Sequence, residues 1–433
     1  MTNPLLVIPG FMGSQLARVT DHQRVWVDPT WAVTHVNEFL DNLALKTTTD
    51  DRLKPDGILH DVNIGDIVRI GIYRDLHEFC VSPAGLGLPP TDYHEVAYDW
   101  RKTLSEAAQQ VATALVAIPN PPVNVIAHSQ AGLVVSALYR DAPSAAARIG
   151  KIFALGCPFA GLLKTIAMLQ GGSGILTNFF PEDPIRSLLI GMPGTYEMLP
   201  SPHNPGLIRD AAGNTVSPFD HPDWFPPAVF DPSLLSAAAD SLAILSAEFE
   251  VPLRIIEGYG VSTGTYAQWN GTNLEVQSTE DGDGTCPARS LLSATGTGGG
   301  STLAIRWLSI PFGEHVELVR RREFFTFLRA DLIPGSPQPQ QVLACVRRPM
   351  LPLGTENLLI VETRTPDGKP LATGVPIVST TNSMTIPLLP CATAPDARWL
   401  AHFPQPPGAQ RVRVQVPGIP PASQPRPFVI VGT

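Results

Sequence analysis

The stretch NVIAHSQAGLVV, residues 124–135, changes character at a single serine. The branched apolar residues before it predict a short buried strand, Val123–Ala127, and the small and apolar residues after it predict a helix, Gly132–Arg140. A serine at a sharp strand-to-helix turn is held in a strained backbone conformation that raises its hydroxyl above the sheet edge. Ser129 is therefore the candidate nucleophile.

Small residues are needed on both sides of such a serine because strand and helix approach closely there. The usual pattern is G-x-S-x-G, and this chain has Ala127 and Ala131 at the flanking positions. Taken alone, the pattern also fits a buried serine in an ordinary turn.

A serine hydroxyl is a weak nucleophile at neutral pH and needs a histidine base, which a carboxylate must orient. In strand–turn–helix hydrolases the acid and then the base follow the serine along the chain. His315 is the candidate base because it lies in a short loop between the strand-like Leu303–Ile310 and a predicted helix, Val316–Leu328. The other histidines beyond the serine lie in proline-rich sequence or in the C-terminal region: His203, His221 and His402.

The candidate acid lies in the loop 280–290, EDGDGTCPARS, which is dense in carboxylates and glycines. Both Asp281 and Asp283 are candidates. By itself such a loop fits calcium binding or a plain turn equally well.

An oxyanion also needs two main-chain N–H donors. One donor is expected from Gln130, directly after the serine. The other is expected from Phe11, in the loop PGFMGS (9–14) that follows the first predicted strand, Leu5–Ile8.

Strands alternate with helices along the first part of the chain, which predicts a mainly parallel sheet covered on both faces. Two insertions interrupt the alternation: residues 26 to about 87, expected as a lid, and about 165–227, expected as a cap. The remaining predicted elements are the strands Glu95–Tyr98, Lys151–Leu155 and Leu253–Glu257 and the helices Thr103–Ala117 and Pro232–Glu248. The expected pocket residues are Met12, Trp26, Trp31 and Phe159.

The composition changes after residue 332. Prolines in 333–340 predict a linker, and 341–433 carry short alternating runs without helix signals, which predict a small β-sandwich. The expected strands there are Leu358–Thr363, Val375–Val378, Met384–Pro387 and Val412–Val416.

Composition limits the class of protein. Of 433 residues, 44% are apolar and 16% charged, enough for a large core, and the net charge of −9 argues against a nucleic-acid partner. The five cysteines form no CxxC pair, so we expect no zinc site, no metal and no cofactor. Unpaired thiols are favoured, although Cys345 and Cys391 lie in one segment and their pairing stays open. No apolar run is long enough to span a membrane, and the N-terminus lacks the features of a secretory signal, which favours a cytoplasmic location.

Several stretches together resemble the lecithin:cholesterol acyltransferase family, which includes lysosomal phospholipase/acyltransferases and plant phospholipid:diacylglycerol acyltransferases. They occur in the family's order across roughly the first 330 residues: 8–16 (IPGFMGSQL), 97–101 (AYDWR), 126–132 (IAHSQAG), 154–161 (ALGCPFAG), 195–200 (TYEMLP), 282–285 (GDGT) and 314–316 (EHV).

The resemblance implies an α/β-hydrolase fold with lid and cap insertions. It further implies Ser129 as nucleophile, Asp283 as acid, His315 as base, and Phe11 and Gln130 as oxyanion donors. Asp283 is preferred to Asp281 because the family acid precedes a Gly-Thr pair. The β-sandwich has no counterpart in the family.

The expected chemistry is serine-dependent acyl transfer on lipid or other esters with a hydrophobic acyl group. An acyl-enzyme would pass its acyl group to water or an alcohol, with transient contact to a membrane or micelle surface. One alternative is an esterase or transacylase for a soluble or macrocyclic ester. The other is an inactive hydrolase fold that serves as a binding protein.

Overall fold

The structure is a computed structural model. It describes residues 3–26, 34–47, 51–64, 68–171, 182–202, 207–224, 230–291, 293–294, 306–336, 342–346, 350–351, 356–363, 374–380, 385–391, 394–404, 408–419 and 428–432.

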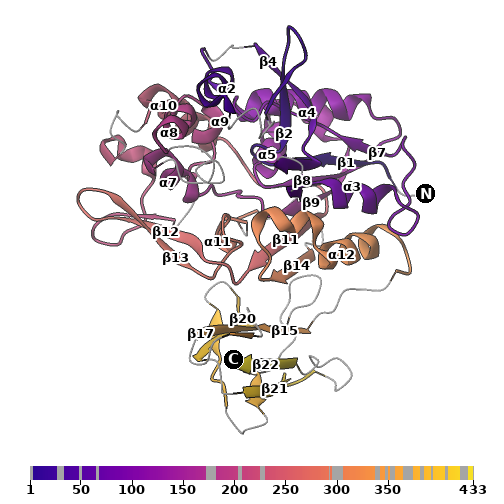
Figure 1. Ribbon diagram of the computed structural model, residues 1–433, viewed down its shortest axis with the longest axis vertical. Coiled ribbons are helices and arrows are strands. Elements are labelled where there is room, and N and C mark those ends of the chain that lie inside the picture. The colour runs from indigo at the N-terminus through magenta and orange to yellow at the C-terminus, as the bar shows by residue number, and fades with distance from the viewer. Residues whose placement is uncertain are drawn as a thin grey trace.

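Its centre is a six-stranded parallel sheet in the order β14-β11-β9-β8-β1-β7 (Figure 1). Neighbouring residues of one strand face opposite sides, as the pleat requires: Leu6 and Ile8 enter one apolar core, and Leu5 and Val7 the other. The strands are β1 (Leu5–Ile8), β7 (Tyr93–Glu95), β8 (Val123–His128), β9 (Ile149–Leu155), β11 (Leu253–Tyr259) and β14 (Arg306–Pro311).

Helices cover both faces of this sheet, which confirms the predicted class. Apolar residues of α4 (Leu104–Ala117) and α5 (Ala131–Asp141) belong to the first core, and those of α3 (Arg74–Val81) and α12 (Arg322–Leu332) belong to the second. Helix α4 begins with a capping box between Thr103 and Glu106. Helix α5 has no side-chain cap, and Gln130 is its N-cap residue, directly after the serine of the site described below.

Three predicted elements need correction. The strand expected at Glu95–Tyr98 is instead β7, which stops at Glu95, because Tyr98 turns away to hydrogen-bond Ser14 and Pro9. The helix expected at Val316–Leu328 is a 3-10 helix, η4 (His315–Arg320), followed by α12, since Arg321 between them is extended. The helix expected at Pro232–Glu248 ends at Ala243.

The insertions carry small elements of their own. Among the described residues, the first contains α2 (Val36–Leu43), β4 (Leu53–Ile58), β5 (Asp61–Ile64), β6 (Val68–Gly71) and α3. Strands β5 and β6 pair with each other, and β4 pairs with β2 (Ser14–Arg18), which precedes the insertion and also pairs with β3 (Arg24–Trp26). The second contains α7 (Lys164–Gly171), α8 (Glu182–Ile190), α9 (Pro193–Tyr196), β10 (Ile208–Arg209), η2 (Pro218–Asp220) and η3 (Pro222–Trp224). The remaining elements before η4 are α6 (Pro143–Ala146), α10 (Pro232–Ala243), β12 (Thr263–Trp269), β13 (Leu274–Thr279) and α11 (Ala288–Leu291). That these insertions act as lid and cap stays a prediction.

The C-terminal strands form two four-stranded sheets, ordered β15-β17-β20-β19 and β16-β22-β21-β18. Apolar residues of both sheets, such as Val361 and Val412, share one core, so the sheets pack as a sandwich. Of the expected strands, Val375–Val378 shifts to β18, and Thr385–Pro387 forms no strand; Met384 lies outside the described residues. The bounds are β15 (Val342–Val346), β16 (Met350–Leu351), β17 (Glu356–Thr363), β18 (Ile377–Thr380), β19 (Leu389–Cys391), β20 (Ala394–Pro404), β21 (Gly408–Gln415) and β22 (Phe428–Gly432). The boundaries predicted at 332 and 341 stay predictions.

The sandwich lies next to the β11 and β14 side of the central sheet (Figure 1). One buried arginine joins the two. Arg398, on β20, is 1% exposed and pairs with Glu257 of β11 and Glu362 of β17. It also donates to the Ser309 hydroxyl at 2.8 Å, and its guanidinium lies 3.7 Å from the centre of the Tyr259 ring. A planar, permanently charged guanidinium suits this position because it satisfies both carboxylates while its face stacks on the ring.

We expect Arg398→Ala to lower the free energy of unfolding by about 3–5 kcal/mol, because it removes the guanidinium whose positive charge balances the buried Glu257 and Glu362 carboxylates. Denaturant unfolding followed by circular dichroism measures the loss. Arg413→Ala, which removes an exposed arginine from β21, is the matched control and should change little. The triple change Arg398→Met, Glu257→Gln, Glu362→Gln should recover part of the loss, since it removes the negative charges together with the positive one. A single variant as stable as the wild type would contradict this account.

Candidate active site

Ser129 lies at the turn between β8 and α5 with a positive φ of 57°, the left-handed region that a non-glycine residue rarely adopts. Its N–H donates to the Leu155 carbonyl at 2.9 Å, and its carbonyl accepts from the Gly132 N–H at 3.0 Å. The turn packs tightly: a Cβ at Gly132 would lie 2.4 Å from the Cβ of Cys157. Small residues are therefore needed beside the serine because the segment that follows β9 passes directly against the start of the helix.

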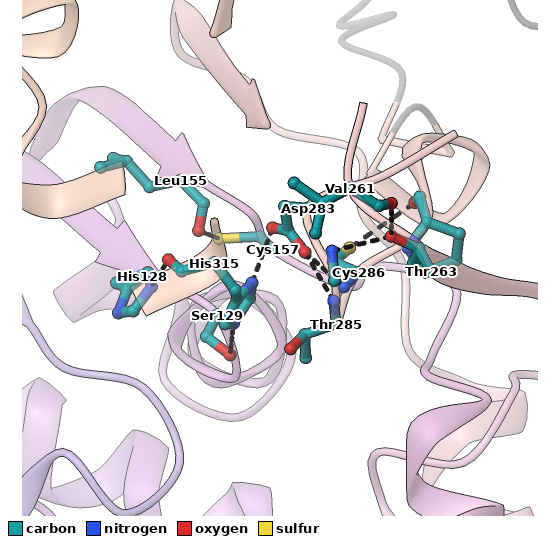
Figure 2. Close-up of polar contacts among 12 residues, drawn as sticks. His128, Ser129, Leu155, Cys157, Val261, Thr263, Asp283, Thr285, Cys286 and His315 are labelled. Atoms are coloured by element: carbon teal, nitrogen blue, oxygen red, sulfur yellow. Dashed lines mark hydrogen bonds and ion pairs between the residues drawn. The ribbon is translucent and has the colours of Figure 1, made fainter. Parts of the chain in front are cut away.

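Ser129, His315 and Asp283 lie in one hydrogen-bonded line (Figure 2). The Nε2 atom of His315 is 2.8 Å from Ser129 Oγ, and its Nδ1 atom is 2.7 Å from Asp283 Oδ2. Each is largely buried, with 7% of Ser129, 8% of His315 and 2% of Asp283 exposed. The fold thus brings together a hydroxyl, an imidazole and a carboxylate from three distant segments.

The carboxylate is oriented by its own loop. Asp283 Oδ1 accepts hydrogen bonds from the main-chain N–H groups of Thr285, at 2.9 Å, and Cys286, at 2.6 Å, which leaves Oδ2 facing the imidazole. The Asp283 carbonyl also accepts from the His315 N–H at 2.9 Å. Of the two aspartates considered from the sequence, Asp283 is the one that contacts His315.

A lysine that the sequence analysis did not single out also supports this loop. Lys164, on α7, lies with Nζ 3.0 Å from Thr285 Oγ1, and its burial lowers the pKa of its ammonium group. No local motif marks it, because it reaches the loop across the fold.

Asp283 and His315 can both lie close to the main chain at residue 156 because that residue is a glycine, with a φ of +53°. A Cβ there would lie 2.8 Å from Asp283 Oδ2 and 3.0 Å from His315 Nδ1. Any side chain would therefore push into the hydrogen bond between the carboxylate and the imidazole.

Two main-chain N–H groups remain available beside the serine. Within the described part of the chain, the N–H groups of Phe11 and Gln130 have no hydrogen-bond partner. The loop 9–14 lies against the turn, since a Cβ at Gly10 would be 2.8 Å from Ser129 Cβ. Tyr98 contacts both the loop 9–14 and the turn after the serine. Its hydroxyl lies 2.9 Å from the Pro9 carbonyl and 3.0 Å from Gln130 Oε1.

The motif Tyr98–Arg101, part of one of the stretches that resemble the family, also supports the loop 9–14. Trp100 Nε1 donates to the Ser14 carbonyl at 3.1 Å, and Arg101 forms a two-pronged ion pair with Asp99 at 2.9 and 2.7 Å.

A buried chain of hydrogen bonds connects this loop to His315. The Gly10 N–H donates to the Tyr73 hydroxyl at 2.9 Å, and that hydroxyl lies 2.7 Å from His128 Nδ1. His128 Nε2 lies 3.1 Å from the His315 carbonyl, which can only accept. Nε2 therefore carries the proton and Nδ1 accepts from Tyr73.

Burial, together with the nearby His315, lowers the pKa of His128 to about 3, so this ring is neutral and positions its neighbours. No sequence pattern pointed to Tyr73, which lies in the first insertion.

Of the four expected pocket residues, the structure describes Met12, Trp26 and Phe159. The Met12 carbonyl accepts from Trp26 Nε1 at 2.7 Å, and the Trp26 and Trp100 rings meet edge to face at 5.4 Å. Phe11 also packs on Trp100, at 5.1 Å. Phe159 is 7% exposed and packs against Phe249. Trp31 lies outside the described residues, and the role of these side chains in a pocket stays a prediction.

No metal ligand was expected here, and the cysteines near the site are thiols. Cys157 and Cys286 are buried and are not disulfide-bonded, and Cys391 likewise forms no disulfide; its sulfur lies 2.7 Å from the Tyr259 hydroxyl. Burial raises the pKa of the Cys157 and Cys286 thiols, so both are protonated and inert as nucleophiles at neutral pH.

The chain is similar to known proteins over parts of its length. Residues 67–221 match the lecithin:cholesterol acyltransferase family, a segment that contains Ser129 but ends before Asp283 and His315. The chain is 29% identical over 149 residues to an uncharacterized protein of Saccharomyces cerevisiae, which is 32% of this chain and 21% of the yeast protein. The match thus spans about a fifth of the yeast protein's length.

Among solved structures, the Tle4–Tli4 complex superposes with a TM-score of 0.51 at 14% identity, over 74% of this chain and 95% of that chain. The mature Bacillus licheniformis lipase BlEst2 superposes with a TM-score of 0.39 at 11% identity, over 77% of this chain and 93% of that chain.

None of the helices formed by the described residues is long and apolar enough to cross a bilayer. The family match supports acyl transfer or hydrolysis on esters in general, and the parallel sheet with its helices gives the architecture. The chain has the α/β-hydrolase fold and, over residues 67–221, is similar to the lecithin:cholesterol acyltransferase family.

Proposed function

We propose that the protein is a serine-dependent enzyme that transfers acyl groups from esters through an acyl-enzyme. The observation that carries this proposal is the line of hydrogen bonds from Ser129 Oγ through His315 to Asp283, with the serine in a strained turn. A buried serine with a merely structural role would need neither an imidazole at its hydroxyl nor a carboxylate behind that imidazole.

In the proposed reaction, His315 Nε2 takes the proton of Ser129 as its oxygen attacks the ester carbonyl carbon. The bond to the carbonyl oxygen becomes single, and the Phe11 and Gln130 N–H groups stabilise the oxyanion. The carboxylate of Asp283 stabilises the imidazolium. His315 then gives the proton to the departing alcohol, and an acyl-enzyme remains.

Water or another alcohol completes the cycle. His315 removes a proton from it, the acyl group leaves Ser129 as a free acid or a new ester, and the serine recovers its proton.

The proposed substrates are lipid esters with a hydrophobic acyl group. The family match supports a lipid class, and apolar aromatic side chains flank the loop that supplies one oxyanion donor: Phe11, Trp26 and Trp100. Transient contact with a membrane or micelle surface belongs to the same proposal. The expected cytoplasmic location stays a prediction, to be checked by cell fractionation.

A series of p-nitrophenyl esters from acetyl to palmitoyl tests the substrate class, with and without a long-chain alcohol. We expect kcat/KM to rise with acyl length and to rise again above the critical micelle concentration. A preference for short, monomeric esters would instead favour the esterase for soluble or macrocyclic esters. Failure of a fluorophosphonate probe to label Ser129 would favour the inactive binding protein.

A further inference from the structure

Two histidines and a glutamate converge at the outer edge of the central sheet. His60 follows β4, His77 lies on α3, and Glu95 ends the edge strand β7. His60 Nε2 is 3.0 Å from each carboxylate oxygen of Glu95, and His77 Nδ1 is 3.3 Å from Oε1. One potential ligand atom from each residue lies within 4.8 Å of the others, the one such group found in the part of the chain that the structure describes.

We propose that His60, His77 and Glu95 form a binding site for a divalent transition metal of the zinc class. Zinc is bound at about 2.0–2.1 Å by imidazole nitrogen and carboxylate oxygen, so neighbouring ligand atoms of a tetrahedral site lie about 3.3 Å apart. The two measured histidine–glutamate separations, 3.0 and 3.3 Å, already have this spacing. Calcium and magnesium prefer all-oxygen ligands and fit this set poorly.

The surroundings favour a cation at this point. Tyr93 donates to Glu95 Oε1 at 2.6 Å, the kind of outer hydrogen bond that orients a ligating carboxylate. Two nearby arginines are themselves paired with carboxylates: Arg74 Nε lies 2.8 Å from Asp61 Oδ2, and Arg24 Nε lies 3.4 Å from Asp56 Oδ2.

The site is reachable from solvent. His60 and Glu95 line a pocket of about 430 Å³ together with Gln15, Arg24, Asp56 and Asp61. The exposed fractions of the His60, His77 and Glu95 side chains are 34%, 37% and 22%. Three protein ligands with an open side leave room for water as the fourth ligand.

A metal here would tie together the segments that support the oxyanion loop. The His60 carbonyl accepts from the Ile72 N–H at 2.8 Å, and Leu59 donates to the Gly13 carbonyl at 2.9 Å and accepts from the Tyr73 N–H at 3.2 Å. Tyr73 in turn holds Gly10 and His128. The metal therefore acts on stability and does not take part in the proposed acyl transfer.

The full-length protein, stripped with a chelator and dialysed, is titrated with Zn²⁺ and with Co²⁺. We expect one equivalent per chain by elemental analysis and the strong visible absorption of tetrahedral cobalt. We also expect a rise in Tm of about 3–6 °C at a hundredfold excess over Kd. Absence of stoichiometric binding would overturn the proposal.

Variants localise the metal. His77→Ala and Glu95→Gln should each weaken binding by about 100-fold or more, since even outer-shell losses cost 10–100-fold. Glu95→Gln keeps the shape of the side chain, so it remains informative if His77→Ala unfolds. His94→Ala is the matched control, because His94 is a half-buried neighbour of Glu95 whose side chain hydrogen-bonds the Thr91 carbonyl and is not among the converging ligand atoms. Full binding by the double variant His60→Ala, His77→Ala would place the metal elsewhere and refute the site.

Discussion

Replacing Ser129 with alanine should lower kcat for ester hydrolysis by about 10⁶-fold, the loss seen when the nucleophile of a serine hydrolase is removed. The physical reason is that no other described hydroxyl or thiol is hydrogen-bonded to His315 Nε2, and the nearby thiols of Cys157 and Cys286 are protonated. Hydrolysis of a p-nitrophenyl ester, together with covalent labelling by a fluorophosphonate, measures the effect.

Ser136→Ala is a matched control for this change. Ser136 lies two turns further along α5 and is equally buried, and its hydroxyl has no hydrogen-bond partner among the described residues. Its removal should leave both activity and labelling unchanged. If Ser129→Ala kept substantial activity or the probe still labelled it, another nucleophile would be at work.

Asp283→Asn should lower kcat by about 10⁴-fold with little change in structure. The amide keeps the shape of the carboxylate but can present N–H to His315 Nδ1, which then holds the imidazole in the tautomer whose Nε2 is protonated. That ring is unable to take the serine proton, and the imidazolium loses the charge that stabilises it. Steady-state kinetics and a circular dichroism spectrum separate this chemical loss from misfolding.

Asp281→Asn is the matched control, two residues away in the same loop. Its carbonyl accepts from the Ala288 N–H, a contact that the substitution leaves intact. We expect activity close to that of the wild type. A larger loss in Asp281→Asn than in Asp283→Asn would reverse the assignment of the acid.

Much of the central sheet could be predicted because its signals are local. β1 has the predicted bounds, and β8, β9 and β11 differ from the predicted strands only at their ends, since each is a short branched run between turn residues. Predictions were wrong where side chains redirect the backbone, as at Tyr98, whose contacts with Ser14 and Pro9 end β7 early. Neither partner is near Tyr98 in the sequence.

Some residues of the candidate site could likewise be predicted from local sequence, and others could not. The strand–serine–helix pattern marks Ser129 because strand and helix are each encoded within a few residues. Local spacing left Asp281 and Asp283 both open, and the resemblance to a family favoured Asp283, which is the aspartate that contacts His315. Tyr73 and Lys164 carried no signal, because each acts through contacts across the fold.

The sequence by itself determined the alternation of strands and helices, the position of the strained serine and the presence of a β-rich C-terminal region. Hydrophobic periodicity and turn residues are short-range properties, and they are readable without coordinates. Only the tertiary structure decided which charges meet. Arg398 meets Glu257, and His60 and His77 meet Glu95, only because of the strand order and the way the helices pack on the sheet. These residues are far apart in the sequence, and no motif links them.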